Sequence, residues 1–204
     1  MNRKALCFVV LTCGLIGGTA VRMYGGQHGP GGVGQGPAVA SEAGKIQIGY
    51  GIAPVPLDLN GKNPALVGLG SYIVNAQGDC AGCHSNPQYV PGGDPHLGQP
   101  EISDPSGHLR GGNQLFGPLI VPRNLTPNAA GLPGGLTLNQ FLEVFSIGTD
   151  FDNAPPVVPG PHSPDLLQIM PWPVFSKMTD REKRAIYEYL RAIPCLPVGS
   201  SRCN

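Results

Sequence analysis

The chain has 204 residues, including 31 glycines and 23 prolines, and it carries 13 basic and 13 acidic side chains. Gly and Pro make up about a quarter of the chain, roughly twice the ~12% of average usage. A hydrophobic share of 41% and the lack of a Gly-X-Y repeat exclude a disordered chain and a collagen-like fibre. The balanced charge argues against a nucleic-acid-binding protein, whose affinity requires an excess of Lys and Arg.

Residues 1–22 have the features of an export signal. Arg3 and Lys4 precede an uncharged run from Ala5 to Val21 that ends in small residues suited to signal-peptidase cleavage. The run also reaches the lower limit for a membrane span, so a retained N-terminal anchor is the alternative, and a lipoprotein cut before Cys13 is a third. Each reading predicts an exported protein, either soluble in the periplasm or anchored to the outer face of the cytoplasmic membrane.

The region that follows divides into a linker and a domain. Residues 23–43 are rich in Gly and Pro and lack periodicity, which predicts a flexible tether. A single domain is expected over residues 44–204. No strand of convincing length is visible in it, and its predicted helices leave loops of about 40 and 30 residues between them. Structureless loops of that length are uncommon in a compact domain unless they enclose something.

The sequence predicts a mainly α domain with about three to five short helices, three of which have clear signals. Their limits are marked by a proline at the first position of one helix, by capping boxes at the start of the other two, and by glycine or proline stops. Apolar residues recur at i, i+3 and i+4 in each. The expected helices run from about Asn63 to Ala76, from Thr137 to Gly148, and from Thr179 to Pro194.

A Cys-x-x-Cys-His motif occupies residues 80–84. Cys80 and Cys83 lie three residues apart, so that one turn presents both thiols to the two vinyl groups of a porphyrin. His84 is then directed at the iron as the proximal ligand. The motif therefore predicts one covalently attached haem c.

Other interpretations of this motif are weaker. A thioredoxin-like redox site needs a βαβ context, and no strand precedes the motif. A four-ligand zinc site needs a second close pair of ligands, which the remaining cysteines do not provide. A disulfide between Cys80 and Cys83 would leave His84 unexplained.

The sixth ligand of the iron is expected to be a Met or a His. The candidates are His96, His108, His162, Met170 and Met178. We favour Met170, because the prolines that follow it fix the backbone. Met178, at the entry to the third helix, suits a core position. His162, in a Pro-rich loop, is the best histidine alternative. Trp172 could cover an edge of the haem.

From about Leu69 to Pro194 the chain resembles a class I cytochrome c domain. It is similar to the mono-haem and multi-haem c-type subunits of periplasmic membrane-bound dehydrogenases. The residues that carry the resemblance are 72–76 before the haem motif, 116–118, 124–127, 134–141, 170–173 and 178–191. The resemblance implies that Met170 is the distal ligand and that Asn124 lies beside the haem. It also implies that the first and last helices cross at Gly70 and Tyr189.

The chain departs from these relatives in three places. It has one Cys-x-x-Cys-His motif where the dehydrogenase subunits often have three. Residues 148–167 form a Pro-rich segment that does not follow the family's sequence pattern. Cys195 and Cys203 are additional. In an exported protein this pair is expected to form a disulfide that closes the C-terminal tail.

The sequence therefore predicts an electron carrier rather than an enzyme. With His84 and Met170 both bound, the iron has no open position for a substrate. A dehydrogenase, a quinol-oxidising complex or a terminal oxidase would be the redox partner. The alternatives are a haem enzyme or gas sensor with a displaceable distal ligand, and a structural electron-transfer subunit of a larger complex. The excess of Gly and Pro is attributed to the linker and to loops around the haem. The haem itself would then supply much of the core.

Overall fold

The structure is a computed structural model that describes residues 41–115, 120–152, 163, 165–197 and 203. All of these residues belong to one compact unit, Val39–Asn204. The described part is mainly helical, and its chain pairing is limited to isolated bridges such as Leu115–Ile120 and Thr149–Leu166. Within the described residues, no helix is both long enough and apolar enough to span a bilayer. The elements are α1 (Glu42–Ile52), α2 (Pro64–Tyr72), the π-helical turn η1 (Ile73–Gln77), α3 (Cys80–His84), the 3₁₀ turn η2 (Pro95–Leu97), α4 (Leu138–Ile147), α5 (Trp172–Phe175) and α6 (Asp180–Ala192).

The three predicted helices are confirmed, with the starts that the sequence indicated. Pro64 opens α2, and the helical run continues through η1 to Gln77. The capping boxes of α4 and α6 both form, because Thr137 and Thr179 each exchange hydrogen bonds with the residue three positions later. Gly148 ends α4 in the left-handed conformation, at φ 79°.

The described residues contain more α-helices than the three to five expected. The additional helix α1 has three glycines, which weaken the periodic pattern, but Ser41 caps it by accepting a hydrogen bond from the backbone N–H of Gly44 at 3.1 Å. Helix α1 thus starts at Glu42, slightly before the expected domain boundary at residue 44. The turns α3 and α5 are too short for periodicity to reveal.

Glycines let α2 lie close to both α1 and α6. A Cβ atom on Gly49 of α1 would overlap the Gly68 carbonyl, and one on Gly70 of α2 would overlap the Ala185 carbonyl of α6. The predicted crossing of the first and last helices at Gly70 and Tyr189 is therefore confirmed. Buried residues of α2, η1, α4 and α6 form the apolar core, among them Val67, Leu69, Ile73, Phe141, Phe145, Ile186, Tyr189 and Leu190.

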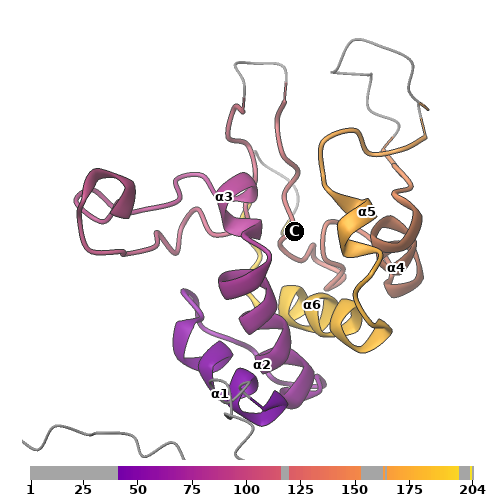
Figure 1. Cartoon of the computed structure of the whole chain (residues 1–204), viewed down its shortest axis with the longest axis horizontal. Coiled ribbons are helices and arrows are strands. Elements are labelled where there is room, and N and C mark those ends of the chain that lie inside the picture. Colours follow the sequence, from indigo (N-terminus) through magenta and orange to yellow (C-terminus); the bar gives the residue numbers. More distant parts are fainter. Residues whose placement is uncertain (1–40, 116–119, 153–162, 164, 198–202, 204) are drawn as a thin grey trace, which may run out of the picture. The chain divides into compact units, whose positions relative to one another are not determined.

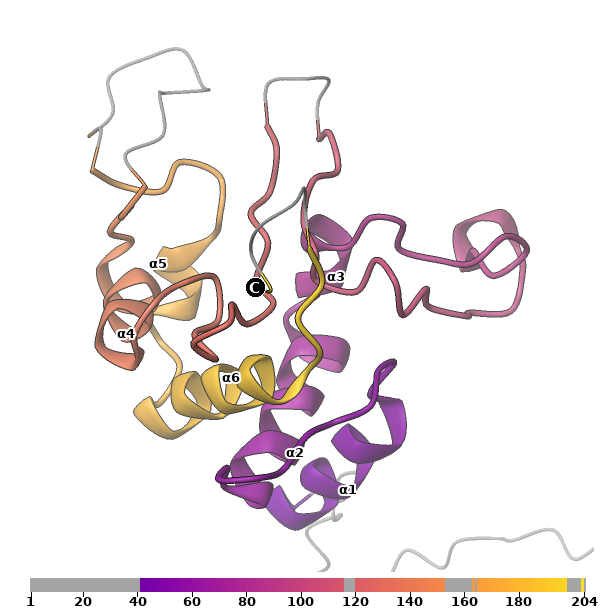
Figure 2. The same ribbon diagram turned by 180° about the vertical axis from the view of Figure 1, so that it is seen from behind.

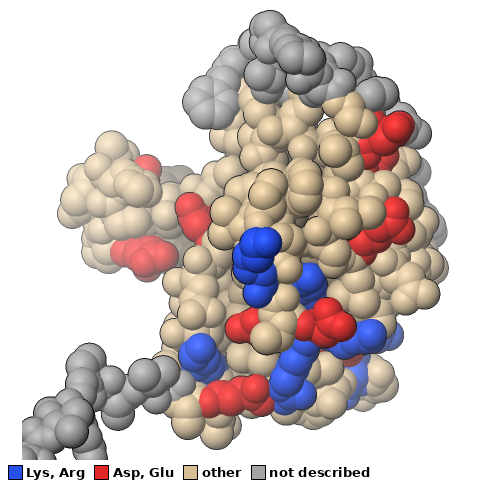
Figure 3. Space-filling model, turned by 45° about the vertical axis from the view of Figure 1, so that its right-hand side comes forward, with Lys and Arg blue, Asp and Glu red and all other residues tan. Residues whose placement is uncertain are grey.

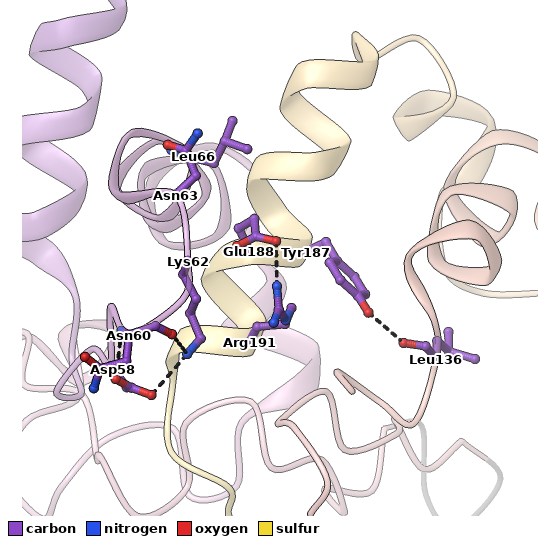
Figure 4. A network of polar contacts seen from close by, with 9 residues as sticks. All are labelled: Asp58, Asn60, Lys62, Asn63, Leu66, Leu136, Tyr187, Glu188 and Arg191. Carbon is purple, nitrogen blue, oxygen red and sulfur yellow. Dashed lines mark hydrogen bonds and ion pairs between the residues drawn. The ribbon is translucent and has the colours of Figure 1, made fainter. Parts of the chain in front are cut away.

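Figure 1 and Figure 2 show α6 below the middle of the unit, with α3 and α5 on opposite sides above it. The two segments that meet at the Leu115–Ile120 bridge rise between them, and the loop that carries η2 extends outward from α3. Contacts from α6 fix the surrounding segments. The Tyr187 hydroxyl donates to the Leu136 carbonyl at 3.1 Å, as Figure 4 shows, just before α4 begins. The loop between α3 and α4 is therefore anchored to α6 at its C-terminal end.

Charged side chains form scattered ion pairs. Arg181 of α6 pairs with Glu42 of α1 at 2.6 Å, and Lys62 pairs with Asp58 at 3.0 Å in the turn before α2 (Figure 4). Pairs at the surface contribute little to stability, because water and dissolved salt screen their charges. On the face in Figure 3, basic and acidic groups are mixed in the lower part and much of the remainder is uncharged. This face therefore carries no extended surface of a single sign.

Cys195 and Cys203 form a disulfide, with their Cα atoms 5.7 Å apart. The expected closure of the C-terminal tail is thus confirmed. The tail is also held from the other side, because Asn124 donates to the Leu196 carbonyl at 2.7 Å and Leu196 donates its N–H to Thr126 at 3.1 Å.

Candidate haem-binding site

The Cys-x-x-Cys-His motif folds as the single helical turn α3. Asp79 precedes the turn in the left-handed conformation, at φ 45°. Cys80 is half-buried and Cys83 exposed, and neither is in a disulfide. Burial raises the pKa of the Cys80 thiol to about 12, so it is protonated at neutral pH. The turn thus presents two free thiols three residues apart, as thioether attachment of a porphyrin requires.

The imidazole of His84 is oriented by a backbone contact. Its Nδ1 lies 2.8 Å from the carbonyl oxygen of Arg123. A carbonyl only accepts hydrogen bonds, so Nδ1 must carry the proton, and Nε2 is left as the unprotonated nitrogen that can bind a metal. Burial lowers the pKa of His84 and favours the neutral ring. Both effects prepare His84 to act as an iron ligand.

Met170, the favoured distal residue, lies in a bend directly before α5. It is half-buried and packs against the apolar core. Its carbonyl accepts a hydrogen bond from the Trp172 N–H at 2.7 Å, which fixes the turn into α5. Met178 is also half-buried against the core, in agreement with the packing role expected of it. The assignment of Met170 as the distal ligand stays a prediction.

Trp172 is anchored to the end of α4. Its indole N–H donates to the Leu167 carbonyl at 3.1 Å, and a Cβ atom on Gly148 would overlap its ring. Gly148 thus serves both as the left-handed end of α4 and as the surface on which the indole packs. Whether the half-buried ring also covers a haem edge stays a prediction.

The histidine alternatives occupy different surroundings. His108 is 3% exposed, and its Nε2 shares a hydrogen bond with the Tyr189 hydroxyl at 2.9 Å. Burial lowers the pKa of His108 to about 4, so the ring is neutral. His96 lies exposed in η2, in an edge-to-face contact with Tyr89. His162 lies outside the described residues. His108 thus has a structural partner in α6.

The predicted polar residue Asn124 is buried within a hydrogen-bonded segment. Its Oδ1 accepts from the N–H of Thr126 at 2.8 Å and its Nδ2 donates to the Leu196 carbonyl. These bonds fix the Asn-x-Thr segment and bind it to the C-terminal tail. A contact between Asn124 and a haem stays a prediction.

Two buried polar atoms indicate that the residues around α3 fit a haem. Arg110 Nε and Asn113 Oδ1 are buried and have no hydrogen-bond partner among the residues that the structure describes. Buried polar atoms are nearly always paired, so each needs a partner from outside the chain or a reoriented side chain. A haem brings two propionate carboxylates, which accept hydrogen bonds and so match the Arg110 guanidinium. Asn113 Oδ1 is itself an acceptor, so Asn113 would contact a carboxylate only with its amide group turned round. The backbone N–H of Gly111, next to Arg110, donates to the His84 carbonyl at 2.6 Å, so this polar segment adjoins the proximal histidine.

Sequence reasoning missed Arg123, Arg110 and Asn113. Arg123 contacts His84 through the Arg123 main-chain carbonyl oxygen. Every residue has such a carbonyl, so the amino-acid sequence does not reveal this contact. Its position directly before the Asn124 segment was the one available signal. The unpaired atoms of Arg110 and Asn113 become visible only when burial is known.

Comparison with known proteins gives two relatives. Over 155 residues the chain is 27% identical to the alcohol dehydrogenase (quinone), cytochrome c subunit of Gluconobacter oxydans (strain 621H), covering 76% of this chain and 26% of that protein. Over 127 residues it is 28% identical to the gluconate 2-dehydrogenase cytochrome c subunit of Pantoea cypripedii, covering 62% of this chain and 23% of that protein. No protein-family model and no solved structure matches the chain.

Both relatives are cytochrome c subunits, and the fold is mainly helical as a class I cytochrome c domain requires. The resemblance drawn from the sequence is therefore confirmed. The chain spans about a quarter of the length of the curated relatives it matches.

Proposed function

We propose that the chain is an electron-transfer protein with one haem c attached through Cys80 and Cys83 and ligated axially by His84 and Met170. The observation that carries this proposal is α3, where the two free thiols share one turn and the Arg123 carbonyl orients the imidazole of His84. The bound haem supplies a reversible one-electron couple.

The chain's own residues give this couple its surroundings. His84 is neutral and keeps Nε2 for the metal, while the bend before α5 holds Met170 against the core. Occupation of both axial positions leaves no place for a substrate, so the chain transfers electrons and does not catalyse a reaction. Arg110 supplies a guanidinium donor for the propionates, and Asn124 and Trp172 complete the surroundings.

A dehydrogenase is the proposed redox partner. The support for it is that both relatives are named as cytochrome c subunits of dehydrogenases. A quinol-oxidising complex and a terminal oxidase are the other partner classes. The haem attachment motif and the Cys195–Cys203 disulfide suit an oxidising compartment outside the cytoplasm. Residues 1–22 would act there either as a cleaved signal or as a membrane tether.

Optical spectroscopy of the exported protein tests this function. We expect a pyridine haemochrome spectrum of haem c and a ferric Met–iron charge-transfer band that Met170→Ala abolishes. Met178→Ala is the matched control, because Met178 is also half-buried against the core, and it should keep the band. A band that survives Met170→Ala would show that another residue is the ligand. A native high-spin ferric spectrum, with binding of peroxide or CO, would overturn the electron-transfer assignment in favour of a haem enzyme or gas sensor.

A further inference from the structure

Arg123 contacts the proposed proximal ligand through its backbone and the residues after α4 through its side chain. Its carbonyl oxygen accepts the hydrogen bond from His84 Nδ1 at 2.8 Å. Its guanidinium binds two carboxylates beyond α4, with Nη2 2.5 Å from Asp150 Oδ1 and Nε 2.8 Å from Asp152 Oδ2. The segment that contains Arg123 runs between α3 and α4 (Figure 1). One residue thus joins the proximal histidine to the end of α4.

The two carboxylates differ in their surroundings. The Asp150 side chain is 7% exposed, whereas that of Asp152 is 64% exposed. The nearly buried carboxylate is poorly screened by water, and removal of one partner of such a pair leaves the other uncompensated. Asp150 Oδ1 also accepts from the Asp152 N–H at 3.0 Å, so it organises the turn. Asp150 is therefore the partner on which the position of the Arg123 side chain depends.

Asp150 is in turn bonded to the chain that leads to Met170. Its N–H donates to the Asp165 carbonyl at 2.7 Å. The neighbouring Gly148 carbonyl accepts from the Leu167 N–H at 2.8 Å. Leu167 also accepts the indole N–H of Trp172. Hydrogen bonds, an ion pair and short stretches of backbone therefore connect His84 through Arg123 and Asp150 to the residues on both sides of Met170.

We propose that Arg123 is a positioning residue that couples the orientation of His84 to the placement of the segment carrying Met170. This proposal rests on the proposed function, since it concerns the two residues assigned there as axial ligands. Arg123 does not touch the iron in this scheme. Its carbonyl sets the direction of the proximal imidazole, and its ion pair with Asp150 keeps the distal segment closed. Loss of the Asp150 carboxylate should therefore loosen both axial positions together.

Two measurements on the intact haem protein test the coupling. Imidazole added to the ferric form competes with Met170, so its affinity reports how easily the distal segment opens. Exchange of the His84 Nδ1 proton with solvent, followed by NMR in the reduced form, reports the bond to the Arg123 carbonyl. In Asp150→Asn we expect imidazole to bind about tenfold more tightly, and the ring proton to exchange at least about tenfold faster.

Matched variants separate coupling from general destabilisation. Asp152→Asn removes the exposed carboxylate of the same guanidinium and should change either measurement by less than about threefold. Val67→Ala destabilises the buried core in α2 and should leave both measurements near wild type. Arg123→Lys keeps the charge but not the paired geometry, and it should behave as Asp150→Asn does.

The outcomes are distinct. If Asp150→Asn raises imidazole affinity without changing ring-proton exchange, Asp150 acts on the distal loop alone and the coupling is wrong. If Val67→Ala reproduces both changes, general destabilisation explains them and the proposal is also wrong. If the wild-type charge-transfer band survives Met170→Ala, the ligand assignment fails, and the coupling to Met170 fails with it.

Discussion

The hydroxyl of Tyr189 is the only group that Tyr189→Phe removes, and its surroundings allow the cost to be worked out. The side chain is 0% exposed, and its oxygen lies 2.9 Å from His108 Nε2 and 3.1 Å from Asn75 Nδ2. Asn75 keeps a second acceptor, the Ser71 hydroxyl at 3.1 Å. The loss therefore falls mainly on His108, whose buried Nε2 is left without the partner it has in the native protein.

A buried polar group left unpaired costs ~1–3 kcal/mol. We expect Tyr189→Phe to lower the free energy of unfolding by that amount, and the melting temperature by roughly 2–4 °C per kcal/mol for a domain of this size. Urea unfolding of the haem protein, followed by circular dichroism, measures the change. The haemochrome spectrum is recorded alongside to confirm that haem content is equal.

The double variant Tyr189→Phe with His108→Leu supplies the control. When both partners are replaced by apolar groups, no polar atom is left unsatisfied, so the double variant should be more stable than the sum of the two single changes predicts. A cost below ~0.5 kcal/mol for Tyr189→Phe, with strictly additive single changes, would show that the bond between α6 and the His108 loop contributes nothing and that this reasoning is wrong.

Two further predictions concern the same helices. Gly70→Ala should lower the free energy of unfolding by at least ~3 kcal/mol, the upper end of the range for overpacking, because the new Cβ would overlap the α6 backbone. Gly51→Ala has open space around it and should raise the free energy of unfolding by ~0.5–1 kcal/mol. Thermal unfolding of both variants checks this. Burial lowers the pKa of His108 from 6.5 to about 4 in the folded protein. Between pH 6.5 and about 4, His108 is therefore protonated in the unfolded chain but neutral in the folded one. Stability should therefore fall by about 3 kcal/mol as the pH drops through this window, and denaturant unfolding should show that His108→Leu flattens the dependence.

The features that the sequence predicted well are local. The capping boxes at Thr137 and Thr179 depend on residues three positions apart, and Gly148 ends α4 because its own φ is positive. The Cys-x-x-Cys-His motif is likewise contained in one turn. Such signals require no knowledge of the rest of the fold, and each was found in its expected place.

The features that the sequence did not predict depend on contacts between distant segments. Helix α1 has a weak apolar pattern, and it is held by Gly49, which lets its backbone approach α2, and by the Ser71 hydroxyl, which donates to the Gly49 carbonyl at 2.7 Å. The role of Arg123 depends on partners 39 residues before it and 27 residues after it. Periodicity within one segment carries no information on either.

The structure also changes what the excess of glycine means. The composition was attributed to a linker and to loops around a haem, and Gly111 and Gly148 do occupy left-handed positions outside regular helices. Gly49, Gly68 and Gly70, however, lie inside helices, where glycine costs ~0.5–1 kcal/mol relative to alanine. They occur there because α2 is pressed between α1 and α6, so close that a Cβ atom would meet the neighbouring helix. Part of the glycine content therefore builds a tight helical core of the protein's own, from which α2 and η1 continue towards α3 and its Cys-x-x-Cys-His motif.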